Sequence, residues 1–294
     1  MTSQPAVAVV VAAIDARATI AASLDRVRAE VAGRGEVVVV DASRDGTAEF
    51  VESLVPGVRV ERRAPGLLTP ELWRDGLRAI SAPLVAFTTA QMVPRPGWLS
   101  ALLATLDASG AAAVGGPIAP GPGLDTIGRA TFLQRFARAL PPVTGAIDPP
   151  GDNSLYRRDR LVGLEALWAD GFWEVPILRA LRDRGATTAI APGAVVEFVG
   201  GTGLAPLLRQ RLRHARRFGA SRSLGRGPAH RLARTAAAPL IPPLLVARAL
   251  AALRRRRLPV APWAAAMPAL GLLATTWALG ELAGTWEEST DFPI

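Results

Sequence analysis

The sequence predicts an α/β fold, with a mixed and mostly parallel sheet flanked by helices, followed by C-terminal membrane helices. Over the first 200 residues, short β-branched runs alternate with segments of helical spacing, which is typical of a mostly parallel sheet. The clearest run is at 37–40, where four consecutive valines have the composition of a strand buried on both faces. Long apolar stretches near the C-terminus predict the membrane helices.

The expected elements alternate along the chain. We expect strands at residues 7–13, 37–40, 58–61, 84–87, 187–191 and 195–198. We expect helices at residues 19–32, 47–54, 71–80, 127–140 and 166–184. The first strand-to-helix turn, at 12–16, contains no glycine, so the fingerprint of a dinucleotide-binding Rossmann domain is missing. Residues 116–151 are rich in proline and glycine and predict a long irregular insertion around a helix.

Composition excludes several kinds of chemistry. The chain of 294 residues has no cysteine and no lysine, which excludes disulfides, thiolate nucleophiles, zinc–thiolate sites and lysine Schiff bases. Its two histidines, His214 and His230, are too few for a multi-histidine metal site. We therefore expect any catalytic acid or base to be an aspartate or a glutamate.

The net charge of +9 is unevenly distributed. Residues 1–200 carry 20 arginines and 21 acidic residues, whereas residues 201–280 carry 14 arginines and no acidic residue. A nearly neutral domain is thus followed by a strongly basic segment. Such a segment favours an anionic partner, which could be a membrane surface, a diphosphate or a nucleic acid.

Two apolar segments lie near the C-terminus. Residues 235–253 contain three prolines and Arg248 and have arginines at both ends, so we expect this segment to lie in the membrane interface or to re-enter rather than to cross. Residues 258–280 are 23 residues without a charge, long enough to span a bilayer. Trp263 and Trp277 lie near the ends of this span, where interfacial anchors are common.

These observations divide the chain into three expected parts. They are an α/β domain at 1–205, a basic amphipathic interfacial segment at 206–234 and hydrophobic membrane-associated helices at 235–294. The first 20 residues lack the features of a signal peptide. We therefore expect a protein of the cell membrane with its α/β domain on the cytoplasmic side.

The four-valine strand ends at a carboxylate, Asp41, and a turn then leads into the next helix. Ligands of open α/β sheets bind just past the carboxyl ends of strands, so Asp41 is placed to contact one. Residues 37–47, VVVVDASRDGT, resemble the "VVDDGSTDGT" segment of family-2 glycosyltransferases, which bind nucleotide-sugars on a GT-A fold. The resemblance implies that Asp41, together with Asp15, contacts the nucleoside. The alternative is an ordinary strand and turn in which Asp45 caps the next helix.

The segments 83–94 and 96–99 are similar to the family's "vlfLDADcvP…pgWL" segment. The family's Asp-x-Asp, which holds a divalent cation against the donor diphosphate, falls on Thr89-Ala90-Gln91. Hard cations prefer charged oxygen ligands, and neither Thr89 nor Gln91 supplies one, so no residue is assigned as a metal ligand. Mg²⁺ or Mn²⁺ remains a possible cofactor. Thr89 and Gln91 are expected to hydrogen-bond the sugar or a phosphate instead.

Two later segments extend the resemblance. Residues 151–158 resemble the family's "GaNmayRR" segment near the donor sugar, which implies a sugar contact for Asn153. Residues 171–185 are similar to the region "ED…L…G" that ends in the family's catalytic base, and this places the base at Glu174. Flanking aromatic residues, Phe172 and Trp173, could partly desolvate the carboxylate and raise its pKa toward the working pH. The alternative is an exposed glutamate at a helix start, favoured by the helix dipole.

Residues 210–214 resemble the family's Gln-x-x-Arg-Trp element, with histidine in place of tryptophan. The resemblance implies that Gln210, Arg211 and Arg213 bind the donor diphosphate, since arginine can hold phosphate oxygens bidentately. The same segment could instead be a basic amphipathic helix lying on anionic membrane lipid. Both interpretations can hold together.

The resemblance implies an inverting transferase that moves a sugar from a nucleotide-sugar donor to an acceptor hydroxyl, with Glu174 as base. A site near the membrane suggests a lipid-linked or membrane-delivered acceptor. The replaced Asp-x-Asp also allows a non-catalytic relative that binds a nucleotide-sugar or a partner. Nucleic acid is not expected as a partner, because the basic segment lacks interleaved aromatic residues.

Overall fold

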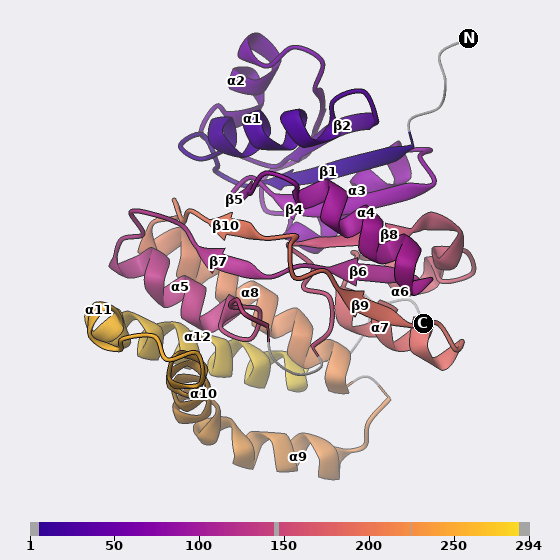
Figure 1. Cartoon of the computed structure of the whole chain (residues 1–294). Helices are drawn as coiled ribbons and strands as arrows, with labels where there is room; N and C mark the ends of the chain where they lie inside the picture. Colours follow the sequence, from indigo (N-terminus) through magenta and orange to yellow (C-terminus); the bar gives the residue numbers. More distant parts are fainter. Residues whose placement is uncertain (1–5, 144–146, 224, 288–294) are drawn as a thin grey trace. The chain divides into compact units, whose positions relative to one another are not determined.

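The computed structural model describes residues 6–143, 147–223 and 225–287, which pack as two compact units (Figure 1). The first unit comprises Met1–Gly121 and Ala139–Gly201, and the second comprises Pro122–Arg138 and Thr202–Ile294. The expected insertion helix therefore packs with the C-terminal segment rather than with the α/β domain.

The first unit is built on a mixed, mostly parallel sheet, as the sequence predicted, and this sheet has seven strands. The strands are β1 (Val7–Ala13), β2 (Gly35–Asp41), β3 (Arg59–Arg62), β4 (Leu84–Thr89), β6 (Ala113–Gly115), β8 (Ser154–Arg157) and β9 (Thr188–Ile190). Their order is β3-β2-β1-β4-β8-β6-β9, and only β8 runs antiparallel to its neighbours. A smaller sheet has the order β5 (Met92–Pro94), β10 (Val196–Phe198) and β7 (Ile118–Pro120).

The strand register brings several chain segments to one edge of the large sheet. Ala13 of β1 lies opposite Asp41 of β2. The neighbouring Ala12 pairs with Thr89, the last residue of β4. Because β8 is antiparallel, its first residue, Ser154, lies near this same end of β4. The carboxyl ends of β1, β2 and β4 and the loop before β8 therefore form a single edge.

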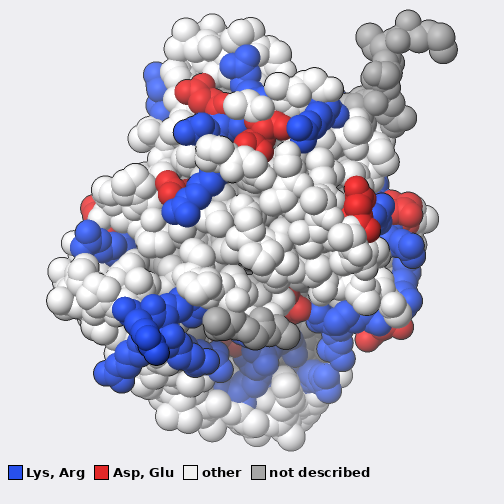
Figure 2. Space-filling model, in the orientation of Figure 1, with Lys and Arg blue, Asp and Glu red and all other residues white. Residues whose placement is uncertain are grey.

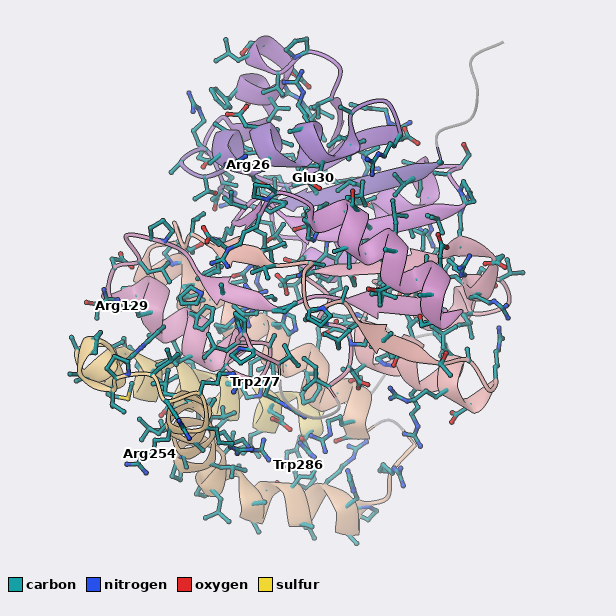
Figure 3. All side chains as sticks on the ribbon, in the orientation of Figure 1. Arg26, Glu30, Arg129, Arg254, Trp277 and Trp286 are labelled. Atoms are coloured by element: carbon teal, nitrogen blue, oxygen red, sulfur yellow. The ribbon has the colours of Figure 1, made fainter. Side chains whose placement is uncertain are left out.

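The helices of this unit cover the sheet. They are α1 (Ile20–Val31), α2 (Thr47–Leu54), α3 (Thr69–Ala79), α4 (Trp98–Ser109), α6 (Glu165–Trp168) and α7 (Glu174–Asp183). Helix α3 lies close to β1 because Gly76 has no side chain, and a Cβ there would overlap Val10. Helix α4 is capped by Glu30 of α1, whose carboxylate accepts the N–H groups of Gly97 and Leu99 at 2.7 and 3.0 Å (Figure 3).

One expected helix is interrupted. The continuous helix predicted at 166–184 is observed as α6 and α7, separated by five residues. Gly171, between them, has a φ of 143°, a backbone conformation that disfavours any residue with a side chain. The break places Glu174 at the first position of α7.

A buried asparagine connects several parts of the first unit. The side chain of Asn153 is fully buried and accepts a hydrogen bond from the indole N–H of Trp98 at 2.8 Å. Its amide donates to the carbonyl oxygens of Pro117 and Ala194 at 3.0 and 2.8 Å. Both amide hydrogens are thus used within the fold. Asn153 links the start of β8 to α4 and to the segments that precede β7 and β10.

The second unit is helical. Its helices are α5 (Thr126–Phe136), α8 (Leu204–Ser223), α9 (Pro228–Ala237), α10 (Ile241–Arg255), α11 (Ala261–Ala264) and α12 (Met267–Thr285). Helix α12 packs along α8 with its backbone in close contact. A Cβ at Gly284 would overlap the carbonyl oxygen of Arg216, and one at Gly219 would overlap that of Glu281. Glycines therefore set the spacing of this helix pair.

The expected membrane span at 258–280 is corrected by the structure. This segment is divided between α11 and α12, and α12 buries Leu270, Leu273 and Ala278 within the second unit. Its two tryptophans also pack inside the unit. Trp263 lies 5.8 Å from the ring of Phe132, and Trp277 lies on the side facing α8 (Figure 3).

Another helix meets the length and composition of a membrane span. Among the described residues, only the continuous helical stretch Pro228–Arg255, of 28 residues, is long and apolar enough to cross a membrane, with a mean hydropathy of 1.7 over its most apolar 18 residues. Only 22% of its most apolar part is buried, which leaves large apolar side chains such as Leu232, Leu240 and Leu244 exposed. This stretch includes the segment that we expected to lie in the interface.

Asn153→Ala is expected to destabilise the first unit without acting on any ligand contact. The change leaves the indole N–H of Trp98 and two buried carbonyl oxygens without partners, at a cost of about 3 kcal/mol. The expected result is a thermal unfolding midpoint lowered by roughly 6–12 °C. Val162→Ala, which truncates a side chain that is 67% exposed, is the control and should leave the midpoint nearly unchanged. Equal midpoints for Asn153→Ala and the parent would contradict this role.

Candidate functional site

The end of β2 carries a buried carboxylate. Asp41 is 4% exposed and accepts hydrogen bonds from the hydroxyl of Ser43 at 2.5 Å and from its backbone N–H at 3.3 Å. Burial raises the pKa of the Asp41 carboxyl, and the two hydrogen bonds from Ser43 partly offset that rise. The carboxylate oxygens are thereby held at a defined position on the sheet edge, where they can accept hydrogen bonds from a ligand.

The loops after β1 and β2 hold each other in place. The backbone N–H of Asp15 donates to the hydroxyl of Ser43 at 2.8 Å, and the carboxylate of Asp15 accepts the N–H of Arg44 at 2.8 Å. The carboxylate of Asp45 accepts the N–H of Arg17 at 3.0 Å. Asp15 has a φ of 47°, in the left-handed region, which lets its short polar side chain face the second loop. The two predicted nucleoside contacts, Asp15 and Asp41, are thus brought to one place.

The end of β4 adds neutral polar groups to the same edge. Thr89 is buried, and its hydroxyl has no hydrogen-bond partner among the described residues. Gln91, two residues further along, is half-buried, and its backbone carbonyl oxygen accepts the N–H of Val199 at 3.0 Å. The strand is held from one side by Trp73, whose indole N–H donates to the carbonyl of Thr88 at 2.9 Å. An unpartnered buried hydroxyl at such an edge is suited to donating a hydrogen bond to an oxygen of a bound sugar or phosphate.

The segment Thr89-Ala90-Gln91 at this edge does not fit a divalent cation. Within the described ranges, no group of three or more His, Cys, Asp or Glu side chains could hold a metal ion. Thr89 and Gln91 supply a hydroxyl and a carboxamide where a cation would need charged oxygens. No step of the chemistry below is assigned to a metal.

Glu174 stands beside a glycine and a tryptophan. A Cβ added to Gly151 would lie 3.1 Å from the Oε2 atom of Glu174 and 2.8 Å from the ring of Trp73. The missing side chain at Gly151 therefore lets the carboxylate and the indole approach the same point. Gly151 precedes β8, so this point belongs to the edge formed by the ends of β1, β2 and β4.

An aromatic cluster supports the Glu174 segment. Phe172 packs on Phe87 and Tyr156, with ring centres 4.5 and 5.1 Å apart, and Trp73 lies 5.8 Å from Phe87. Burial raises the pKa of the Tyr156 hydroxyl above its usual range, and the negative charge of Glu174 raises it further. Glu174 therefore lies close to a cluster of buried aromatic side chains. The expected aromatic neighbour Phe172 belongs to this cluster.

The structure brings most of the predicted site residues of the first unit together. Asp15, Asp41, Thr89, Gln91 and Glu174 all belong to the one edge of the large sheet. Asn153 differs, because its side-chain hydrogen bonds are made within the fold and none of its surface is exposed. We therefore leave it out of the proposed sugar contacts.

Three residues that contribute to this edge were missed at the level of sequence. They are Ser43, which holds Asp41, and Trp73 and Gly151, which adjoin Glu174. The glycine and the serine lie inside the quoted motifs, but their partners are distant in sequence. Trp73 lies in none of the quoted motifs, and a large aromatic side chain on a helix is common at core positions without any functional role.

The predicted diphosphate contacts lie on α8 of the second unit. Arg211 is 5% exposed, and its guanidinium lies 5.9 Å from the ring centre of Trp277. Burial lowers the pKa of the neighbouring His214 well below its usual value, and the charges of Arg211 and Arg135 lower it further. Gln210 is half-buried and Arg213 is exposed. Diphosphate binding by Gln210, Arg211 and Arg213 stays a prediction.

Comparison with sequence families gives one match. The model of the family described as glycosyl transferase family 2 matches residues 8–162. This stretch spans β1 to the residues just after β8 and includes all the strand ends that form the site edge. A comparison with curated protein sequences gives no match.

Solved structures share the fold at low sequence identity. A mannosyltransferase of Pyrobaculum calidifontis, solved with GDP-Man and Mn²⁺, is 20% identical with a TM-score of 0.56, over 97% of this chain and 88% of that one. Glucosyl-3-phosphoglycerate synthase of Mycobacterium tuberculosis, solved with Mn²⁺, UDP and phosphoglyceric acid, is 23% identical with a TM-score of 0.51, over 72% of this chain and 77% of that one. With a family match over half of its length and the fold of these enzymes, the chain belongs to glycosyl transferase family 2 and is a glycosyltransferase of the GT-A fold.

Proposed function

We propose that this glycosyltransferase moves a sugar from a nucleotide-sugar donor to an acceptor hydroxyl, with inversion at the anomeric carbon and with Glu174 as the base. The related structures contain GDP-Man or UDP, which supports a nucleotide donor. The observation that carries the proposal is the placement of the Glu174 carboxylate beside Gly151, at the sheet edge that also holds Asp41 and Thr89.

In the proposed reaction, the nucleoside of the donor contacts Asp15 and Asp41, and the sugar lies against Thr89 and Gln91. Glu174 takes the proton of the acceptor hydroxyl as its oxygen attacks the anomeric carbon. The new carbon–oxygen bond forms on the face opposite the breaking bond, so the configuration inverts. The nucleoside diphosphate leaves with the electron pair of the broken bond.

A binding-only relative is the second candidate function. It is favoured by the neutral Thr89-Ala90-Gln91 segment, which lacks the charges that would hold a cation against a departing diphosphate. Such a protein would bind a nucleotide-sugar at the same edge without transferring it. The two candidates differ in turnover and not in binding.

We also propose that the acceptor is lipid-linked or delivered by the membrane, and that the enzyme works at the cytoplasmic face of the cell membrane. The support comes from the apolar stretch Pro228–Arg255 and from the arginines at 254–257 that follow it. Figure 2 shows a group of basic side chains without acidic neighbours over the end of α10, where Figure 3 labels Arg254. Clustered arginines beside exposed apolar residues are suited to an anionic lipid surface.

Glu174→Gln is expected to lower the rate of sugar transfer by ~10²–10⁴-fold, because the amide cannot accept the acceptor's proton. Donor binding should change little, since the shape of the side chain is kept. Steady-state kinetics give the rate, and the thermal shift produced by GDP or UDP gives binding. Glu174→Asp should keep part of the activity.

Asp41→Asn is the matched control for these measurements. It should abolish most of the nucleotide-induced thermal shift while the unliganded protein stays folded, because the change removes a buried charge and keeps an acceptor for Ser43. Normal turnover by folded Glu174→Gln would contradict the role of the base. Nucleotide binding by the parent with no transfer to any acceptor or to water would favour the binding-only candidate.

Turnover is expected to survive EDTA, because Thr89-Ala90-Gln91 supplies no charged ligand for a divalent cation. Arg213→Ala is expected to lower turnover roughly 10–100-fold, because arginine would then no longer neutralise the charge of the diphosphate. This loss should be at least as large as the loss caused by EDTA. Arg209→Ala, another exposed position of the same helix, is the control. Complete loss of turnover in EDTA with recovery on Mn²⁺ would show that a metal is required.

The full chain is expected to float with vesicles of anionic phosphatidylglycerol more strongly than with neutral phosphatidylcholine. Replacing Arg254, Arg255 and Arg257 with Gln should lower partitioning by on the order of 100-fold, because each arginine near such a surface contributes about 1 kcal/mol. The matched control replaces three exposed arginines of the first unit, Arg26, Arg28 and Arg44, with Gln. Equal partitioning of the two triple variants would contradict the proposed lipid contact.

A further inference from the structure

A pocket of about 790 Å³ opens at the edge of the large sheet opposite the candidate active site. It is lined by Leu84, the first residue of β4, and by Arg157, the last residue of β8, which pair in the sheet. Thr89, at the other end of β4, belongs to the candidate active site. Five residues of strand at ~3.3 Å each separate the two places by roughly 16 Å.

The walls of this pocket are largely apolar. Leu77 of α3, Pro83 and Leu161 contribute aliphatic surface, and Trp168 of α6 contributes an aromatic face. The volume lies within the range of pockets that hold small organic ligands. An apolar body of modest size would therefore lose its contact with water here.

The acidic groups at the rim already have partners. Asp159 lies 3.8 Å from the guanidinium of Arg160, and the carboxylate of Glu165 accepts the N–H of Gly163 at 3.1 Å. Arg157 is also engaged, since it donates to the carbonyl of Leu106 at the end of α4 and pairs with an aspartate there.

Two arginines of the lining remain without an acidic partner. In the part of the chain that the structure describes, no ion pair involves Arg78 or Arg158. Arg78 lies with its guanidinium 5.7 Å from the ring centre of Trp168, which orients it by a cation–π contact. Arg158 follows β8 directly and is half-buried. The indole N–H of Trp168 is buried without a partner.

We propose that this pocket binds an amphipathic anion, a small molecule with an aliphatic or aromatic body and a phosphate or carboxylate head. The head would pair with Arg78 and Arg158, because guanidinium groups match the geometry of both kinds of oxyanion. The body would lie between Leu77, Leu161 and Trp168. The site is separate from the proposed catalytic edge and does not depend on the proposed reaction.

The test uses octyl phosphate with the full-length protein, by isothermal titration below the concentration at which the probe aggregates. Inorganic phosphate tests the head alone, and octanol tests the body alone. Octyl phosphate is expected to bind at least about tenfold more tightly than either fragment. Octanoate, which carries the other head group, is expected to compete with it.

Arg158→Gln is expected to weaken octyl phosphate at least about tenfold, since it removes a charged donor to the head. Arg160→Gln, two residues away and outside the lining, is the matched control. Arg78→Gln is the second variant and covers the case in which Arg158→Gln does not fold. The triple variant at Arg254, Arg255 and Arg257 should keep the affinity, which separates this pocket from the basic C-terminal surface.

Octyl phosphate is also expected to bind in the presence of saturating GDP or UDP, because the two sites lie at opposite ends of β4. Competition between the probe and the nucleotide would overturn the proposal. So would equal affinities of Arg158→Gln, Arg78→Gln and the parent, or an affinity of inorganic phosphate that equals that of octyl phosphate.

Discussion

The parallel pairing of β1 with β2 on one side and β4 on the other is the constraint on which the candidate site depends. It aligns Ala13 with Asp41 and Ala12 with Thr89. A shift of one residue in either pairing would turn the side chains of a strand to its other face and separate these groups. The buried valines of β2 oppose such a shift, because they would lose their places in the core. Packing of apolar residues therefore sets the positions of the polar residues at the strand ends.

At the strand ends, position is refined by hydrogen bonds between loops. Ser43 connects Asp41 to the backbone of Asp15, so two loops that are distant in sequence hold one another. Trp73 donates a hydrogen bond to β4, and its ring lies next to Gly151, which also adjoins the carboxylate of Glu174. Short side chains and one large indole thus supply the rigidity that a site on loops requires.

The second unit uses different physical means. Glycines bring α8 and α12 into backbone contact, and the buried carboxylate of Glu281 pairs with Arg234 and Arg222. The apolar stretch Pro228–Arg255 leaves large side chains exposed instead of burying them. The exposed apolar side chains of α9 and α10 support the proposed contact of these helices with lipid.

The sequence by itself determined the strands β1 to β4, β9 and β10, the position of Asp41 at the end of a strand, and the basic character of the C-terminal segment. These properties are local, since β-branched runs, turns and charge are visible without knowledge of partners. Only the tertiary structure decided that Asn153 connects buried segments, that Gly171 interrupts an expected helix and that α12 buries one face within the second unit. The reason is that burial and hydrogen bonding depend on distant partners. An apolar helix has the same composition whether lipid or protein covers it.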